Sequence, residues 1–244
     1  MCENLLKSGE LKMLGLKRNI VLSESDFDDS GNIKASSLMQ HFQDIAQLHA
    51  TSVNLGFEDL MKDCRIWVMT KLKFKVYRKM LAGSQYEFST YPRGKKSVTW
   101  FRDYYVYDRE GNLFAAAISN WCIINFNTRR IERANVDFNG EFIDHPAIEG
   151  GIEKIRIPED IECVGTHHVT EEDLDENAHV NNCRYADMIG EITGRNDYNE
   201  FIIHFAKESR KGDSIELYKT ESEGYVYAEG KLEDGTVIFQ AKVR

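Results

Sequence analysis

Apolar residues recur every three or four positions between Ala35 and about Leu55, and this spacing predicts a long amphipathic helix. Asn32 or Ser36 is expected to cap it, because a short polar side chain accepts a hydrogen bond from the free N–H groups of a first turn. The pattern then changes to alternation in IWVMTKLKFKVY, residues 66–77, which predicts a half-buried strand. Its apolar face carries Leu72, Phe74 and Val76, and its polar face carries Lys71, Lys73 and Lys75.

Three further strand-like runs follow, YEFSTY, VTWFRDYYVY and LFAAAISNWCIINF, separated by the turn signals PRGKK and DREGN. Residues 127–165 lose this regularity and contain Pro146 and Pro158, which indicates a linker. Beyond it come a helical run, VNNCRYADMIGEI, and strand-like runs at FIIHFA, SIELYKT, YVYAEGKL and TVIFQAKV. The expected organisation is an N-terminal unit over residues 1–135, a linker over 136–164 and a C-terminal unit over 165–244.

The two halves align without a gap when the segment that starts at Asp26 is set under the segment that starts at Asp173. Asp28 then meets Asp175, and two later pairs of blocks match in the same order: RKMLAGSQYE with KESRKGDSIE, and EGNLFAAAIS with DGTVIFQAKV. One strand, one long helix and an antiparallel meander that wraps the helix form the pattern of a hotdog fold. The predicted fold is therefore α+β, a tandem (double) hotdog with an antiparallel sheet around a long central helix in each half.

Composition narrows the class of protein. The chain of 244 residues is 42% apolar and 29% charged, with only three prolines, as expected of a folded protein with a sizeable core. A net charge of −9 opposes general binding to nucleic acid or to an anionic membrane, since both require clustered Lys and Arg. The N-terminal stretch lacks the apolar core of a signal peptide, and no run of about 18 apolar residues occurs. We expect a cytoplasmic protein.

Five scattered cysteines without a CxxC pair indicate neither a disulfide framework nor a zinc knuckle.

The aligned halves differ at three polar positions. Asn177 faces Ser30, His179 faces Asn32, and Glu208 faces Lys79. Both helices need caps, so groups that merely capped a helix would be expected in both copies. The asymmetry predicts one chemically active site, in the second half, and a structural first half.

The segment DLDENAHVNNCRY carries Asp175, Asn177 and His179 at alternate positions, followed by the residues V-N-N. This D-x-N-x-H-V-N-N pattern resembles the active-site motif of the acyl-acyl carrier protein thioesterases, and the chain looks like a bacterial homologue of the plant enzymes. The family pattern includes a glutamate on the next strand; FAKESRKGDS supplies Glu208, with Ser209 where plant members carry Cys. The first half is similar to the family in QDIAQLHATSVNLGF, RIWVMTKLKFKV and SNWCIINFNTRR.

The resemblance implies hydrolysis of the thioester between a fatty acyl chain and its carrier protein, which releases free fatty acid and ends chain elongation. It implies acyl carrier protein as the partner and neither a cofactor nor a metal. A homodimer is left open.

This reaction requires a water made nucleophilic, donors for the oxyanion and a dry slot for the acyl tail. Glu208 is expected to be the base, with His179 orienting the water and Asp175 holding His179 or Asn177. The amide of Asn177 and the N–H groups at the start of the following helix are candidate oxyanion donors. The acyl slot is assigned to aromatic residues of the first half, with core packing as the alternative: Trp67, Phe74, Trp100 and Trp121.

Other interpretations of these side chains stay open. Asn181 and Asn182 fit helix caps better than catalysis. Cys183 beside His179 suggests a thiol nucleophile, and a zinc site is conceivable with neighbouring ligands, although their spacing is irregular. Those ligands are Cys163, His167 and His168.

Two basic clusters have the charge to dock an acidic carrier protein, although a solvated face is the simpler interpretation. One cluster is Lys71, Lys73, Lys75, Arg78 and Lys79, and the other is Arg129, Arg130 and Arg133.

Alternative functions are a hotdog acyl-coenzyme A thioesterase, a hotdog hydratase or dehydratase, and a catalytically inactive acyl-binding module.

Overall fold

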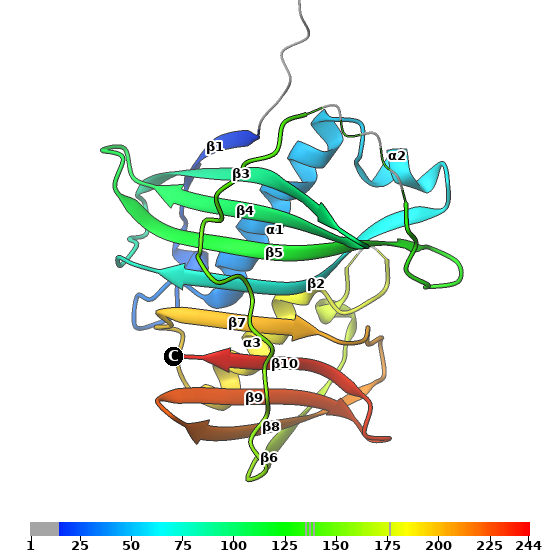
Figure 1. Cartoon of the computed structure of the whole chain (residues 1–244). Helices are drawn as coiled ribbons and strands as arrows, with labels where there is room; N and C mark the ends of the chain where they lie inside the picture. Colours follow the sequence, from blue (N-terminus) through cyan, green and yellow to red (C-terminus); the bar gives the residue numbers. More distant parts are fainter. Residues whose placement is uncertain (1–14, 135, 137, 139, 176) are drawn as a thin grey trace, which may run out of the picture.

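The computed structural model describes residues 15–134, 136, 138, 140–175 and 177–244. These residues form a ten-stranded antiparallel sheet in the order β1-β3-β4-β5-β2-β7-β10-β9-β8-β6, with α1 and α3 on one side (Figure 1). The α+β class predicted from the sequence is confirmed. The strands are β1 Leu16–Val21, β2 Arg65–Val76, β3 Gln85–Lys96, β4 Thr99–Tyr107, β5 Leu113–Asn125, β6 Glu162–His168, β7 Glu200–Phe205, β8 Ser214–Ser222, β9 Tyr225–Leu232 and β10 Val237–Val243.

The first long helix, α1 (Ala35–Ser52), lies against the first-half strands and is followed by the short α2 (Phe57–Met61). Its buried side includes Leu38, Phe42 and Ile45, as the spacing predicted. The predicted caps are wrong. Lys34 occupies the N-cap position with extended backbone and no side-chain cap, since the chain enters the helix from a loop closed by its own main-chain bonds.

The second long helix, α3 (Asn182–Thr193), begins where Asn181 accepts a hydrogen bond from the N–H of Cys183 at 3.0 Å, so Asn181 is confirmed as a cap. The helix ends at Gly194, whose φ of 68° is left-handed and favours glycine. Gln43 of α1 donates to the Sγ of Cys183 at 2.9 Å, so the two helices touch inside the molecule. Within the described part of the chain, no helix combines the length and the apolar character needed to cross a membrane.

Strands β2 and β7 pair in antiparallel fashion and join the two halves into one continuous sheet. Phe74 stacks on Phe201 across this seam, with ring centroids 5.0 Å apart and planes 2° from parallel. On the opposite face Lys73 is only 6% exposed, because it pairs with Glu153 at 2.8 Å and with Glu200 at 3.0 Å. The interpretation of the strand lysines as a solvated row is therefore wrong for Lys73.

Glu153 belongs to the segment between β5 and β6, whose described residues form no helix or extended strand and run across the outer face of the sheet (Figure 1). Ile148 packs against Ala116 and Ile118 of β5, and farther along Ile155 packs against Ile202 of β7. This segment thus covers both halves of the sheet on the side away from the helices.

The loops before α1 and α3 have the same internal hydrogen bonds. In each, an aspartate Oδ1 accepts from the N–H groups two and four residues later, at 2.8 to 3.1 Å. The acceptors are Asp28 and Asp175, and the donors are Ser30 and Asn32 in the first loop and Asn177 and His179 in the second. Gly31 and Ala178, at the same place in the two loops, both have positive φ, 71° and 59°.

Candidate functional site

His179 and Glu208 lie side by side, although they come from different loops. His179 ends the loop before α3, and Glu208 follows β7; His179 Nε2 is 3.4 Å from Glu208 Oε2. The side chains are 12% and 36% exposed, so the pair sits just below the surface. The two loops are also joined through the main chain, since the N–H of Val180 donates to the carbonyl of Ser209 at 2.9 Å.

Ser209, at the position where the plant pattern has Cys, is fully buried. Its Oγ lies 2.7 Å from the hydroxyl of Tyr185 on α3. Burial raises the pKa of Tyr185 to about 12, so this phenol stays protonated and available for the hydrogen bond. Ser209 therefore ties the Glu208 loop to the helix, and it is not exposed to act as a nucleophile.

Asp175 acts on the main chain of its own loop. Its Oδ1 accepts from the N–H groups of Asn177 at 2.8 Å and His179 at 3.1 Å, while its N–H donates to the carbonyl of His179 at 2.7 Å. The carboxylate thus fixes the backbone that carries both candidate groups. In these contacts Asn177 takes part through its main-chain N–H, and the role of its side-chain amide stays a prediction.

A further charged residue, Arg129, reaches this site from the turn after β5. Its Nη2 forms an ion pair with Glu208 Oε1, 79 residues away in the sequence. In the sequence Arg129 stands out only as a member of a basic cluster, with docking or a solvated face as the alternatives, and its contact with Glu208 was not predicted. Nothing in the local sequence or in its spacing links Arg129 to Glu208.

The imidazole of His179 is kept neutral by its surroundings. Burial lowers its pKa below the usual 6.5, and the positive charges of Arg129 and Arg210 lower the pKa further. Asp175 acts in the opposite direction, as does a carboxylate at the distance of Glu208. The Nε2 atom of His179 is buried and, apart from its 3.4 Å contact with Glu208, has no hydrogen-bond partner, so its hydrogen-bonding capacity is left for a water or a substrate atom.

Most N–H groups at the start of α3 are already in use. Val180 donates to Ser209, Asn181 to the carbonyl of Asp173, and Cys183 to the side chain of Asn181. These groups are therefore not oxyanion donors, contrary to the expectation from helix position. The amide of Asn177 becomes the stronger of the two predicted candidates.

The thiol and zinc interpretations receive no support from the described residues. Cys183 is buried, accepts from Gln43, and has its pKa raised far above the usual range by burial, which disfavours a thiolate. His167 pairs with Asp173 at 3.0 Å, and His168 lies 3.0 Å from Ser214. Among the residues that the structure describes, no three His, Cys, Asp or Glu side chains gather where they could hold a metal ion.

Of the four aromatic residues assigned to the acyl slot, Trp100 lies on β4 and the other three lie on β2 and β5. The indole N–H of Trp67 donates to the carbonyl of Leu55 at 2.9 Å, and that of Trp121 to Ser119 at 2.7 Å. Both tryptophans are half-buried. Phe74 is 1% exposed and is packed in the core at the seam between the halves.

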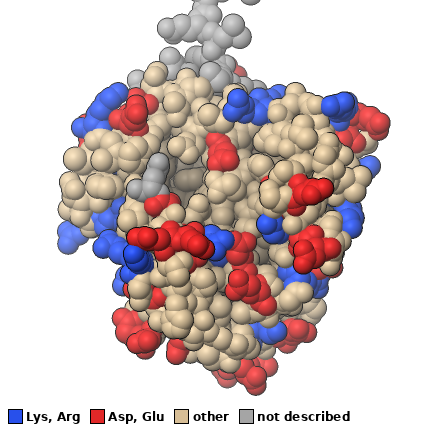
Figure 2. All heavy atoms as spheres, turned by 180° about the vertical axis from the view of Figure 1, so that it is seen from behind, with Lys and Arg blue, Asp and Glu red and all other residues tan. Residues whose placement is uncertain are grey.

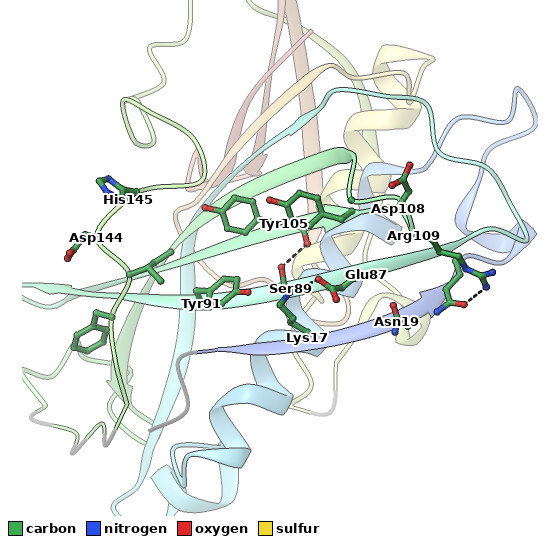
Figure 3. Close-up of a pocket in the computed structure, with 15 residues that line it drawn as sticks. Lys17, Asn19, Glu87, Ser89, Tyr91, Tyr105, Asp108, Arg109, Asp144 and His145 are labelled. Carbon is green, nitrogen blue, oxygen red and sulfur yellow. Dashed lines mark hydrogen bonds and ion pairs between the residues drawn. The ribbon is translucent and has the colours of Figure 1, made fainter. Parts of the chain in front are cut away.

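The surface of the described residues is hollowed on both sides of the sheet. On the side that carries the helices, the surface is hollowed near its centre (Figure 2). On the outer face of the first-half strands there is a groove of about 1210 Å³. Tyr91 and Tyr105 line it, with Asp144 and His145 at one end and Arg109 at the other (Figure 3). No member of the predicted catalytic group lines this groove, so its size does not make it the active site.

Solved structures share this architecture. A crystal structure of an acyl-ACP thioesterase from Bacteroides thetaiotaomicron superimposes with a TM-score of 0.84 at 23% identity, covering 94% of this chain and 96% of that one. The 12:0-ACP thioesterase from Umbellularia californica gives a TM-score of 0.83 at 22% identity, with 96% and 98% covered. Both likenesses concern the fold, which is a hotdog-like α+β fold.

The chain is also similar in sequence to plant enzymes that are named as thioesterases or hydrolases of acyl carrier protein substrates. The chloroplastic oleoyl-acyl carrier protein thioesterase 1 of Arabidopsis thaliana is 22% identical over 95% of this chain and 71% of its own length. The chloroplastic dodecanoyl-[acyl-carrier-protein] hydrolase of Cinnamomum camphora is 24% identical over 94% and 67%. Residues 15–142 match the family model of the acyl-ACP thioesterase N-terminal domain, and residues 159–243 match that of the C-terminal domain. Since these two matches span most of the chain, it belongs to the acyl-ACP thioesterase family.

Proposed function

We propose that this protein hydrolyses the thioester of fatty acyl-acyl carrier protein, releasing free fatty acid and ending chain elongation. The observation that carries the proposal is the pair formed by His179 and Glu208, whose Nε2 and Oε2 atoms lie 3.4 Å apart. Membership of the acyl-ACP thioesterase family supports the substrate class.

In the proposed reaction a water attacks the carbonyl carbon of the thioester. Glu208 takes the proton from that water, and neutral His179 orients it through Nε2. The negative charge that develops on the carbonyl oxygen is stabilised by the amide of Asn177. The tetrahedral intermediate then collapses, the carbon–sulfur bond breaks, and the carrier thiol leaves with a proton returned from Glu208. Asp175 keeps Asn177 and His179 in one backbone geometry throughout.

The fold that we propose for this chemistry is a double hotdog, with units over residues 1–135 and 165–244 and a linker over 136–164. The matching hydrogen bonds of the loops before α1 and α3 support a duplicated unit. In this proposal the first unit holds the acyl chain, with Trp67, Phe74 and Trp121 on its inner wall. Acyl carrier protein is the proposed partner, and the cytoplasmic location and a homodimer stay predictions.

The decisive experiment measures the release of free thiol from acyl carrier protein and coenzyme A thioesters of several chain lengths. We expect faster turnover of the carrier-bound substrates, and a loss of about 10²- to 10⁴-fold in kcat for both His179→Ala and Glu208→Gln. Undiminished turnover in both variants would reject the site. A preference for coenzyme A thioesters would retain the chemistry and reject the proposed partner.

A further inference from the structure

The turn that carries Arg129 is held by a set of main-chain contacts at the end of β5. Asn125 Oδ1 accepts from the N–H groups of Asn127 at 3.1 Å and Thr128 at 3.0 Å. The N–H of Arg129 donates to the carbonyl of Asn125, and the N–H of Asn125 donates to the carbonyl of Arg130, both at 2.9 Å. The direction in which Arg129 leaves the backbone is therefore fixed.

Two features of Arg129 are unfavourable for folding. Its φ of 55° lies in the left-handed region that L-residues rarely adopt. Its Nε is buried without a hydrogen-bond partner, which leaves a desolvated donor unsatisfied. Proteins retain such features mainly where the group has a function, since an ordinary surface ion pair requires neither.

The guanidinium and the imidazole hold opposite sides of one carboxylate. Arg129 Nη2 pairs with Oε1 of Glu208, and His179 Nε2 is 3.4 Å from Oε2. Arg129 contacts the carboxylate through a single nitrogen, Nη2, so the ion pair places Oε1 while His179 contacts Oε2. Only 27% of the Arg129 side chain is exposed, which limits the competition from water.

We infer that Arg129 is a positioning residue of the hydrolytic site, which fixes the Glu208 carboxylate toward His179 and thereby lets the first half of the chain complete a site in the second half. This inference rests on the proposed function. Arg129 acts through Glu208, and its charge, together with that of Arg210, also favours the neutral imidazole against the opposing charges of Asp175 and Glu208.

The test compares wild type with Arg129→Gln, Arg129→Lys and the matched control Arg130→Gln, whose side chain is exposed on the same turn. For each protein, kcat and KM are measured with an acyl-carrier-protein thioester, and the titration of the His179 ring protons is followed by NMR. We expect Arg129→Gln to lower kcat about 10²-fold, as a misplaced catalytic group does, with little change in KM. The pKa of His179 should rise, because a positive neighbour is removed.

Arg129→Lys keeps the charge without the planar fork, so it should lose less kcat and leave the His179 titration near that of wild type. If Arg129→Gln does not fold, the kcat of Arg129→Lys shows whether Arg129 positions Glu208. Wild-type kcat and titration in Arg129→Gln would overturn the inference, and so would a raised KM with unchanged kcat, which is the signature of a docking residue. A wild-type protein inactive on every thioester would overturn the proposed function instead, and the NMR titration alone would then decide the role of Arg129.

Discussion

Ala178 adopts the same left-handed backbone conformation as Gly31, with φ of 59° against 71°, at matching positions of two loops with matching hydrogen bonds. In each loop this residue donates its N–H to the carbonyl of the aspartate that organises the turn, at 3.1 Å from Ala178 and 2.9 Å from Gly31. The two loops therefore share one backbone conformation. The same substitution made in each loop separates the effect of loop geometry on stability from the effect of the side chains on catalysis.

Ala178→Gly is expected to stabilise the protein. An L-residue in the left-handed region costs roughly 1–2 kcal/mol, while glycine adds roughly 0.5–1 kcal/mol of unfolded-state entropy, so the net gain is about 0.5 kcal/mol. Gly31→Ala should lower stability, and a Cβ there has space, so backbone strain alone is tested. Urea unfolding measures both variants. A less stable Ala178→Gly protein would contradict the assigned strain.

Asp28→Ala and Asp175→Ala should destabilise the protein by similar amounts, about 1–3 kcal/mol, because each removes an acceptor shared by two N–H groups. Their effects on turnover should differ. Asp175→Ala loosens the backbone of His179 and is expected to lower kcat by about tenfold or more, whereas Asp28→Ala leaves kcat unchanged. Thermal unfolding and thiol release, measured on the same samples, check this. If Asp28→Ala and Asp175→Ala lowered kcat equally, the loop before α3 would not be the only one that supports catalysis.

Ser209→Ala should cost stability and spare catalysis. The hydroxyl of Tyr185 loses its buried partner at a cost of about 1–3 kcal/mol. Because Ser209 is not placed as a nucleophile, kcat should fall by less than about tenfold, whereas removing a true nucleophile costs far more. The measurement is kcat alongside the urea midpoint. Near-complete loss of turnover in a folded Ser209→Ala protein would reverse this assignment.

The pH profile of kcat/KM should have an acid limb with its midpoint below pH 6.5. The pKa of His179 in the folded protein is lowered by burial and by Arg129 and Arg210, so the imidazole stays neutral at pH 6.5 and becomes protonated only as the pH falls through that lower value. Activity is therefore retained at pH 6.5 and lost below it. Rates on an acyl-carrier-protein thioester, with the enzyme shown folded at each pH, provide the test. A midpoint above 6.5 would mean that the imidazole is stabilised as a cation.

Local patterns in the sequence predicted the elements well and long-range contacts poorly. The spacing of Leu38, Phe42 and Ile45 predicted α1, because burial of one helix face leaves a periodic trace. The strand β6 (Glu162–His168) escaped prediction, since ECVGTHH does not alternate and the strand is mostly exposed. The bulge of β2 between Met69 and Lys71 likewise left no local signal.

The same distinction holds for the site. The comparison of the two halves singled out Asn177, His179 and Glu208, and the resemblance to the family motif added Asp175, which the first half matches with Asp28. Nothing local to Lys73 indicated its burial, which depends on Glu153 from the segment across the sheet. The contact between Arg129 and Glu208 depends on the β2–β7 seam, and pairing between distant strands is set by the whole fold.

The pairing of β2 with β7 has a consequence for any attempt to express the two halves separately. Pairing with β7 covers the edge of β2, so a fragment ending before the linker would carry an open strand edge, a template for mispairing and aggregation. Each half therefore shields its neighbour, and a fragment holding all of the second-half residues would still lack the guanidinium. The two parts of the sheet are therefore expected to be stable only within one continuous chain.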